Sequence, residues 1–149
     1  MSLANYPITF PNSYSNTTVE RFLSNFYRVS DEKPSADHDP YVDEFTSDAY
    51  LKIGPNEALG HADIGKLREN IWAVISGRKH RVFQVFPFSK DSDEVQELAI
   101  YGDVDYTNAD GSTFSVEWTA RFVLSVKGDV VKATDYRVFV GPKPTLVKV

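Results

Sequence analysis

Apolar side chains recur at helical spacing from residue 17 onward. The positions that follow this spacing are Val19, Phe22, Leu23 and Phe26. They fall on one face of a helix, which predicts a helix over residues 17–30 with that face in the core. Thr17 and Glu20 have the spacing of a capping box, in which a hydroxyl and a carboxylate satisfy the first backbone amides. We therefore expect the helix to begin at this pair.

A second stretch of helical spacing runs from Gly60 to Ser76, and Gly77 follows at the position of a left-handed C-cap. Between the two long helices, residues 31–39 are polar and predict a loop. Asp39 and Pro40 suit the start of a short helix extending through Phe45. Residues 48–53 predict a short strand that ends in a turn at residues 54–56.

After Gly77 the hydrophobic period changes from helical to two. Strands are predicted over residues 80–88, 96–106, 114–127 and 130–140, with turn residues between them. Such consecutive strands form an antiparallel meander, and helices must cover one face of it. We expect one α+β domain over residues 1–149: a curved antiparallel sheet packed on about three N-terminal helices, with residues 1–16 as an N-terminal arm.

Composition narrows the function classes. The 149 residues carry a formal charge of −5, which makes nucleic acid and anionic lipid improbable partners. The basic run over residues 78–81 is interpreted as a solvated turn whose cations complement a helix C-terminus. Aromatic residues make up 13% of the chain, a share typical of a core or a pocket lining.

The sequence lacks the residues and motifs that several kinds of catalytic or metal site require. The chain has no cysteine, and its three histidines show no i, i+4 pair, so no metal site is expected. No phosphate-binding loop, dinucleotide fingerprint or nucleophile elbow occurs, and we expect no cofactor. No signal peptide or membrane-length apolar segment is found, which favours the cytoplasm.

Four short segments resemble the NTF2-like superfamily, including its SnoaL-like cyclases and the limonene epoxide hydrolases. They are Gly60 to Ile64 before the long helix, Lys79 to Gln84 in a histidine-bearing strand, the turn Asp110-Gly111, and Gly128 to Tyr136 in the last strand. The resemblance covers about residues 17–140. It implies a cone-shaped α+β fold with a pocket for a small hydrophobic molecule, and commonly a homodimer.

Side chains alternate along a strand, so each strand offers two sets of pocket residues. The resemblance implies that Asp135 points inward, and this register brings Asp103, His80 and Trp118 toward the same pocket. Asp135, Asp103 and His80 are the candidate catalytic residues. The candidate substrate-binding residues are Tyr101, Trp118, Tyr27, Tyr50, Gln84, Arg137, Val116 and Phe139.

Asp103 and Asp135 occupy positions resembling the two carboxylates of the limonene epoxide hydrolases. In an apolar pocket, desolvation and mutual repulsion separate the two pKa values, so that one carboxyl is an acid while the other is a base. The arginine of that family is replaced here by Tyr101, and Arg137 is a candidate substitute.

The alternatives follow from strand register. Leu98 and Ile100 form the more apolar face of their strand, and if they face the helices, Asp103 is solvated. If Asp103 faces inward, a second subunit must cover Ile100. His80 suits proton transfer or a structural hydrogen bond.

Two functions remain open. One is a cofactor-free enzyme of the cyclase, isomerase, dehydratase or hydrolase type, acting on a hydrophobic oxygenated substrate through Asp and His acid–base chemistry. The other is a non-catalytic ligand-binding or dimerisation module of the same fold.

Overall fold

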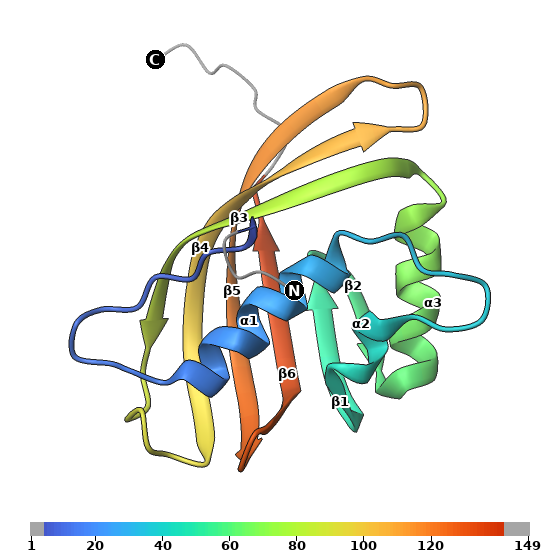
Figure 1. Cartoon of the computed structure of the whole chain (residues 1–149). Helices are drawn as coiled ribbons and strands as arrows, with labels where there is room; N and C mark the ends of the chain where they lie inside the picture. Colours follow the sequence, from blue (N-terminus) through green and yellow to red (C-terminus); the bar gives the residue numbers. More distant parts are fainter. Residues whose placement is uncertain (1–4, 142–149) are drawn as a thin grey trace.

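Six strands form one curved sheet in the order β2-β1-β6-β5-β4-β3, and helix α1 crosses one of its faces (Figure 1). The computed structural model describes residues 5–141. The elements are α1 (Thr17–Ser30), α2 (Pro40–Asp43), β1 (Phe45–Ile53), β2 (Asn56–Leu59), α3 (Gly60–Trp72), β3 (Ile75–Pro87), β4 (Val95–Asn108), β5 (Thr113–Lys127) and β6 (Val130–Val140). Strand β1 is parallel to β6, and the other neighbours are antiparallel. This arrangement confirms the predicted α+β architecture.

Helix α1 buries the predicted apolar stripe against the sheet. Phe26 is fully buried and its ring contacts those of Phe122 on β5 and Tyr136 on β6. Burying one such side chain contributes about 1.5–3 kcal/mol. The N-cap is Asn16 rather than Thr17, because the Asn16 side chain accepts the Val19 amide. Helix α1 is therefore fixed at its start by a cap and along its length by aromatic packing.

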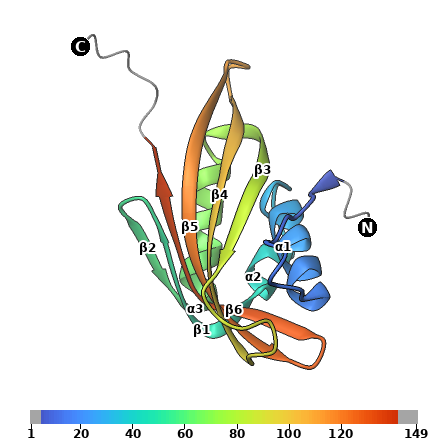
Figure 2. The same ribbon diagram turned by 90° about the vertical axis from the view of Figure 1, so that its left-hand side faces the viewer.

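The sheet has an inner face, which packs on α1, and an outer face turned away from it. Helices α1 and α2 lie on the same side of strands β3–β6 (Figure 2). Leu98, Ile100 and Val104 of β4 are each about 1% exposed, and they belong to the inner face. The register that turned Asp103 inward and exposed Ile100 is therefore wrong, and helix α1 covers the face for which a second subunit was invoked.

Register shifts interrupt the strict alternation of side chains, and two of them, one in β3 and one in β6, affect candidate site residues. The pairing of β3 with β4 shifts between Val82 and Gln84, and the pairing of β6 with β5 shifts near Ala133 and Asp135. An extra residue on one strand turns every later side chain to the opposite face. Ala133 and Tyr136, three positions apart, are consequently both buried on the inner face.

The second long helix is shorter than predicted. Helix α3 ends at Trp72, and strand β3 already begins at Ile75, so Gly77 lies inside a strand and is not a helix cap. The basic run of residues 78–81 also belongs to β3 and is not a solvated turn. Because strands alternate, Arg78 and His80 point inward while Lys79 and Arg81 point outward. Strand β2 was not predicted, and Phe45 belongs to β1.

The described part of the N-terminal arm, residues 5–16, runs beside β3. The Val85 amide donates to the Thr9 carbonyl at 3.2 Å, and the Tyr14 hydroxyl donates to Gln96 at 2.8 Å. Residues 1–4 of the arm lie outside the described residues.

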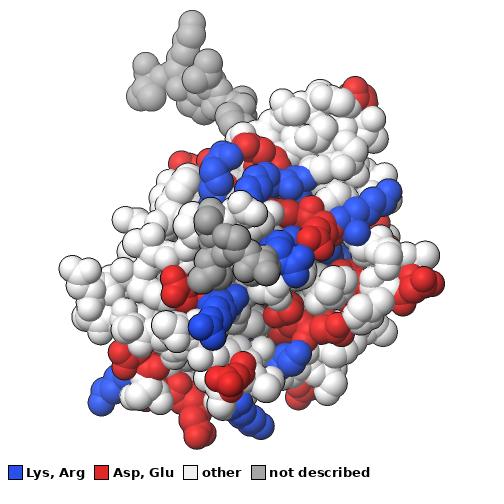
Figure 3. All heavy atoms as spheres, in the orientation of Figure 1, with Lys and Arg blue, Asp and Glu red and all other residues white. Residues whose placement is uncertain are grey.

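On the side of the molecule that carries α1, basic and acidic side chains are interspersed (Figure 3).

Candidate functional site

A small cavity of about 30 Å³ lies on the inner face, between the sheet and the ends of α1 and α2. It is lined by Ser30, Tyr41, Ile53, Arg78, His80, Val104, Tyr106, Trp118, Tyr136, Val138 and Val140. Most of the wall is aromatic or aliphatic, with a few polar groups among it, which is the usual composition of a small-molecule site. The space is about that of one water molecule, so a larger ligand requires the lining side chains to move apart.

His80 and Asp31 form a hydrogen-bonded pair at the wall of this cavity. His80 Nδ1 lies 2.5 Å from Asp31 Oδ1, and the His80 backbone amide donates to Asp31 Oδ2 at 2.8 Å. The Tyr6 hydroxyl donates to the same carboxylate oxygen at 3.0 Å. Because carboxylate oxygens accept hydrogen bonds, the contact with Asp31 Oδ1 assigns the proton to His80 Nδ1. Within residues 5–141 His80 makes no further side-chain hydrogen bond, and its Nε2 is unpaired.

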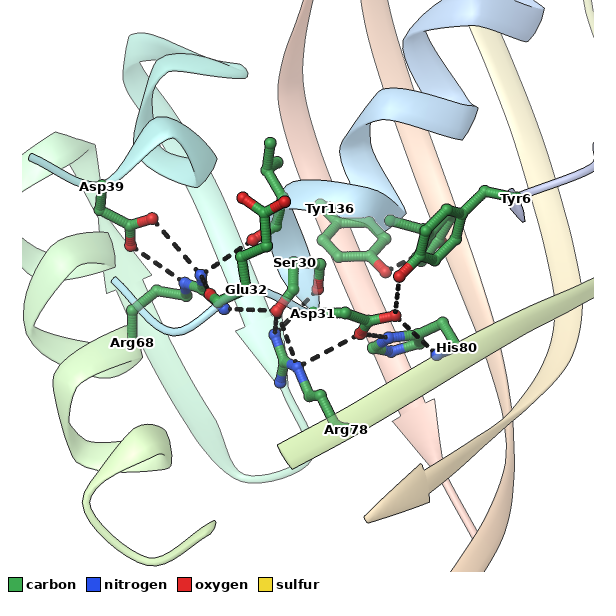
Figure 4. Close-up of polar contacts among 11 residues, drawn as sticks. Tyr6, Ser30, Asp31, Glu32, Asp39, Arg68, Arg78, His80 and Tyr136 are labelled. Atoms are coloured by element: carbon green, nitrogen blue, oxygen red, sulfur yellow. Dashed lines mark hydrogen bonds and ion pairs between the residues drawn. The ribbon is translucent and has the colours of Figure 1, made fainter. Parts of the chain in front are cut away.

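Asp31 owes its position to the C-terminus of α1, where it is the C-cap. Two buried arginines bind the free carbonyl groups there (Figure 4). Arg78 donates to the Ser30 carbonyl at 2.6 and 2.9 Å, and Arg68 donates to the Ser30 carbonyl at 2.8 Å and to Asp39 at 3.0 Å. Cations at a helix C-terminus are favourable because they oppose the partial negative charge of the last carbonyls.

Electrostatics favour a neutral imidazole. Burial lowers the pKa of His80, the Asp31 carboxylate raises it, and the positive charges of Arg78 and Arg68 lower it again, with a net shift downward. Burial also lowers the pKa of Arg78, and the neighbouring charge of Arg68 acts in the same direction. His80 is therefore unprotonated at Nε2 near neutral pH, the state that a general base requires.

Tyrosine hydroxyls supply the donors in this region. The hydroxyls of Tyr27 and Tyr136 lie 3.0 Å apart in a shared hydrogen bond. Burial raises the pKa of both well above the ordinary value, and burial raises that of Tyr41 to about 12. All three phenols stay protonated across the physiological range and can donate but not act as bases.

Four of the residues proposed from sequence lie on the inner face. His80 and Trp118 line the cavity. The Tyr27 ring lies 5.2 Å from that of His80 and 5.3 Å from that of Trp118, measured between centroids. Val116 lies two residues before Trp118 on β5, on the same face of the sheet, and is buried. The structure thus brings together the histidine, the tryptophan and one tyrosine.

The two carboxylates proposed from sequence lie on the outer face, away from the cavity. Asp135 lies 2.9 Å from Arg137 and 3.6 Å from Arg121, measured between oxygen and nitrogen. Asp103 is paired with Arg81 at 2.8 Å. The expectation that Asp135 projects into the cavity near His80 is wrong, because the bulge in β6 turns it outward.

The remaining residues proposed from sequence also lie away from the cavity. Tyr101 donates to Glu117 on the outer face, and the Arg137 guanidinium lies over the Tyr50 ring at 4.9 Å. Phe139 is 61% exposed. Gln84 follows the bulge of β3 and is exposed. Their inward placement was derived from an uninterrupted alternation, which the two bulges break, and for Tyr101 from the wrong face of β4.

Sequence reasoning assigned no role to Asp31 or Ser30, and it interpreted Arg78 as part of a solvated turn. Asp31 was placed in a polar loop, although it directly follows the predicted helix. Arg78 stands two positions before His80, so a strand that begins before residue 78 puts both on one face. That spacing was the available indication of a buried arginine beside the histidine.

Two general findings bear on the chemistry. Among residues 5–141 there is no group of three or more histidine, aspartate or glutamate side chains that could hold a metal ion. No helix in the described part of the chain is both long enough and apolar enough to cross a membrane.

No protein-family model matches the sequence, and a search of curated proteins gives no match. Solved structures do match. A protein assigned as a scytalone dehydratase from Novosphingobium aromaticivorans superposes with a TM-score of 0.74 at 12% identity, covering 89% of this chain and 88% of that one. A type 2 hexachlorocyclohexane dehydrochlorinase (LinA) gives 0.68 at 13% identity, with 89% of each chain covered.

An NTF2-like protein of unknown function from an Exiguobacterium species gives a TM-score of 0.57 at 16% identity, covering 83% of this chain and 98% of that one. The chain therefore has the NTF2-like fold, as the sequence resemblance implied. Identities this low establish the fold alone, and the reaction must be argued from the cavity.

Proposed function

We propose that the chain is a cofactor-free enzyme that removes a proton from a small, hydrophobic, oxygenated ring compound, with His80 as the base and Asp31 as the residue that orients it. The observation that carries the proposal is the 2.5 Å contact between His80 Nδ1 and Asp31 at the wall of an aromatic cavity. An imidazole held at one nitrogen by a carboxylate has a fixed tautomer and a lone pair at the other nitrogen.

The reaction that suits this pair is an elimination. His80 Nε2 takes the proton of a carbon–hydrogen bond, the electron pair of that bond forms a carbon–carbon double bond, and the leaving group departs from the next carbon with its bonding pair. The Asp31 carboxylate stabilises the imidazolium that forms. Where the leaving group is hydroxide, the imidazolium passes the proton to it, water departs, and His80 is restored as the base.

Two structural neighbours support this class of reaction. Their names, a scytalone dehydratase and a hexachlorocyclohexane dehydrochlorinase, denote the removal of water and of hydrogen chloride from the compound that each names. A positioned base in a small, largely apolar cavity serves both, and general acid–base catalysis of this kind contributes about 10²–10⁴-fold. The low identity leaves the substrate of this chain open.

The test compares four variants on scytalone and on hexachlorocyclohexane, with product formation and chloride release as readouts. His80→Gln and Asp31→Asn are expected to lower kcat by about 10²–10⁴-fold. The rival two-carboxylate mechanism expects that loss from Asp135→Asn and Asp103→Asn instead. Circular dichroism verifies that each variant folds. Turnover that survives His80→Gln refutes the proposal.

A non-catalytic ligand-binding or dimerisation module is the second candidate, because identities of 12% and 13% to the two enzyme neighbours establish the fold and not the reaction. Absence of turnover by the unaltered chain on both compounds, together with binding of either one, favours the binding module over the enzyme.

We also propose that the chain forms a homodimer. The outer face exposes Phe139 and, beside Tyr101, Phe83, and sedimentation of the unaltered chain and of Phe139→Ser tests whether these rings are buried between two copies.

A further inference from the structure

The indole of Trp118 carries a buried hydrogen-bond donor with no partner. Trp118 is 2% exposed and lines the cavity, and its Nε1 has no acceptor among the described residues. Buried indole N–H groups usually find a partner, because an unpaired donor forfeits its interaction with water. The role assigned to His80 and Asp31 makes no use of this donor.

The surroundings of the indole hold it in place. Its ring lies 5.3 Å from that of Tyr27 at an angle of 31°, and 5.5 Å from that of His80 at 74°. On β4, Gly102 leaves the space that the indole occupies, since a Cβ atom there would lie 2.9 Å from Trp118 Cζ2. The indole is therefore packed between Tyr27, His80 and Gly102, and Trp118 and His80 line the same cavity.

We infer that the Trp118 N–H donates a hydrogen bond to an oxygen of the bound ligand, and that the ligand is a ring compound whose oxygen is a carbonyl next to the carbon that loses its proton. This inference rests on the proposed function and adds the substrate class to it. An indole N–H can donate but not accept, so its ligand atom must be an acceptor.

Charge in the cavity agrees with a carbonyl. When the base removes a proton beside a carbonyl group, negative charge moves to the oxygen, and a fixed donor there stabilises it. The Arg78 guanidinium, 6% exposed, is a positive charge on the same cavity wall. A hydrocarbon or halogenated ring leaves the N–H unpaired, and the site is expected to bind such an analogue roughly 5- to 150-fold more weakly than the ketone.

The experiment follows the indole N–H by nuclear magnetic resonance, which needs no turnover. The chain has two tryptophans, so ¹⁵N-labelled protein gives two indole signals, and Trp118→Phe assigns them. Trp72 is an internal control, because its Nε1 is also buried and unpaired but it is not among the residues that line the cavity. The probes are cyclopentanone and 1-indanone, each paired with cyclopentane or indane.

Both ketones are expected to move the Trp118 indole proton downfield and to leave the Trp72 signal in place, while the hydrocarbons produce no downfield shift. The preference for ketone over hydrocarbon is expected to fall to near unity in Trp118→Phe. If neither ketone moves the Trp118 signal, or if indane moves it as far as 1-indanone does, the inference is wrong.

The His80→Gln variant separates this inference from the proposed function. A Trp118 shift that persists in His80→Gln, where turnover is expected to be lost, upholds the donor role independently of the base. If the unaltered chain shows that shift but turns over neither scytalone nor hexachlorocyclohexane, the donor role stands and the proposed enzyme does not. Conversely, turnover that depends on His80 with a Trp118 signal insensitive to ketones upholds the enzyme and refutes the donor.

Discussion

Replacing Arg68 tests whether the end of helix α1 is held by buried ionic contacts. The Arg68 side chain is 1% exposed, and it donates to the Asp39 carboxylate and to the carbonyls of Val29, Ser30 and Glu32 at 2.8–3.1 Å. Arg68→Met keeps most of the apolar stem and removes every one of these donors. The variant leaves the Asp39 carboxylate and the carbonyls of Val29 and Glu32 without this partner, while the Ser30 carbonyl keeps Arg78.

Removing one member of a buried ion pair typically costs about 3–5 kcal/mol. The Asp39 side chain is 12% exposed, which favours the lower end because water can partly replace the arginine. For a chain of this length that loss lowers Tm by about 6–20 °C. Lys66→Met is the matched control, since Lys66 lies on the same helix with a side chain 71% exposed.

Urea denaturation followed by circular dichroism measures both variants. A loss for Arg68→Met below about 1 kcal/mol, the value of an ordinary surface pair, contradicts the reasoning. The same variant removes a positive charge that lowers the pKa of His80. An imidazole titration by nuclear magnetic resonance is therefore expected to give a higher His80 pKa in Arg68→Met than in the unaltered protein.

Three further predictions follow from neighbouring contacts. Tyr6→Phe removes the hydrogen bond to Asp31 and is expected to cost about 1–2 kcal/mol, and an unchanged Tm contradicts docking of the arm in solution. The native pKa of His80 is lowered, so as pH drops below about 6.5 the unfolded chain takes up a proton before the folded chain does, and the free energy of unfolding decreases. Urea titrations of His80→Gln should therefore show a smaller decrease in the free energy of unfolding between pH 7 and 5 than the unaltered protein shows. Gly102→Ala puts a Cβ 2.1 Å from the Arg81 carbonyl and should destabilise by about 3 kcal/mol or more, whereas Gly77→Ala meets nothing nearer than 3.7 Å; equal losses in thermal melts rule out this steric account.

Hydrophobic period alone predicted most of the architecture. The helix over residues 17–30 and the four-strand meander follow from it because each element buries one continuous face. The register taken from the family resemblance placed Trp118 on the inner face, and the structure agrees, since β5 carries an unbroken alternation of Val116, Trp118, Ala120 and Phe122.

The rule failed where a strand carries an extra residue. Nothing in the sequence around Phe83 or Thr134 marks the register shifts of β3 and β6, and each shift reverses the side chains that follow it. On β4 the error was of another kind, because Gly102 pairs directly with Trp118 and opposite residues share a face. Placing Asp103 and Trp118 in one pocket was incompatible with that pairing.

The contact of Asp31 with His80 could not be predicted from hydrophobic periodicity for a different reason. Its partner His80 is 49 positions away, and the two meet only because the end of α1 packs over β3. Local patterns predict which residues form an element, whereas contacts between elements depend on how those elements are packed.

The parallel pairing of β1 with β6 sets the order in which the chain can fold. Tyr50 pairs with Asp135, 85 positions later, so β1 and the β2 hairpin attached to it have no place in the sheet until β6 has been synthesised. The antiparallel strands β3 to β6 close short loops, which form first because their entropy cost is small. On the ribosome the helical half therefore emerges first but waits for its sheet, with the aromatic face of α1 exposed to chaperones and to other nascent chains.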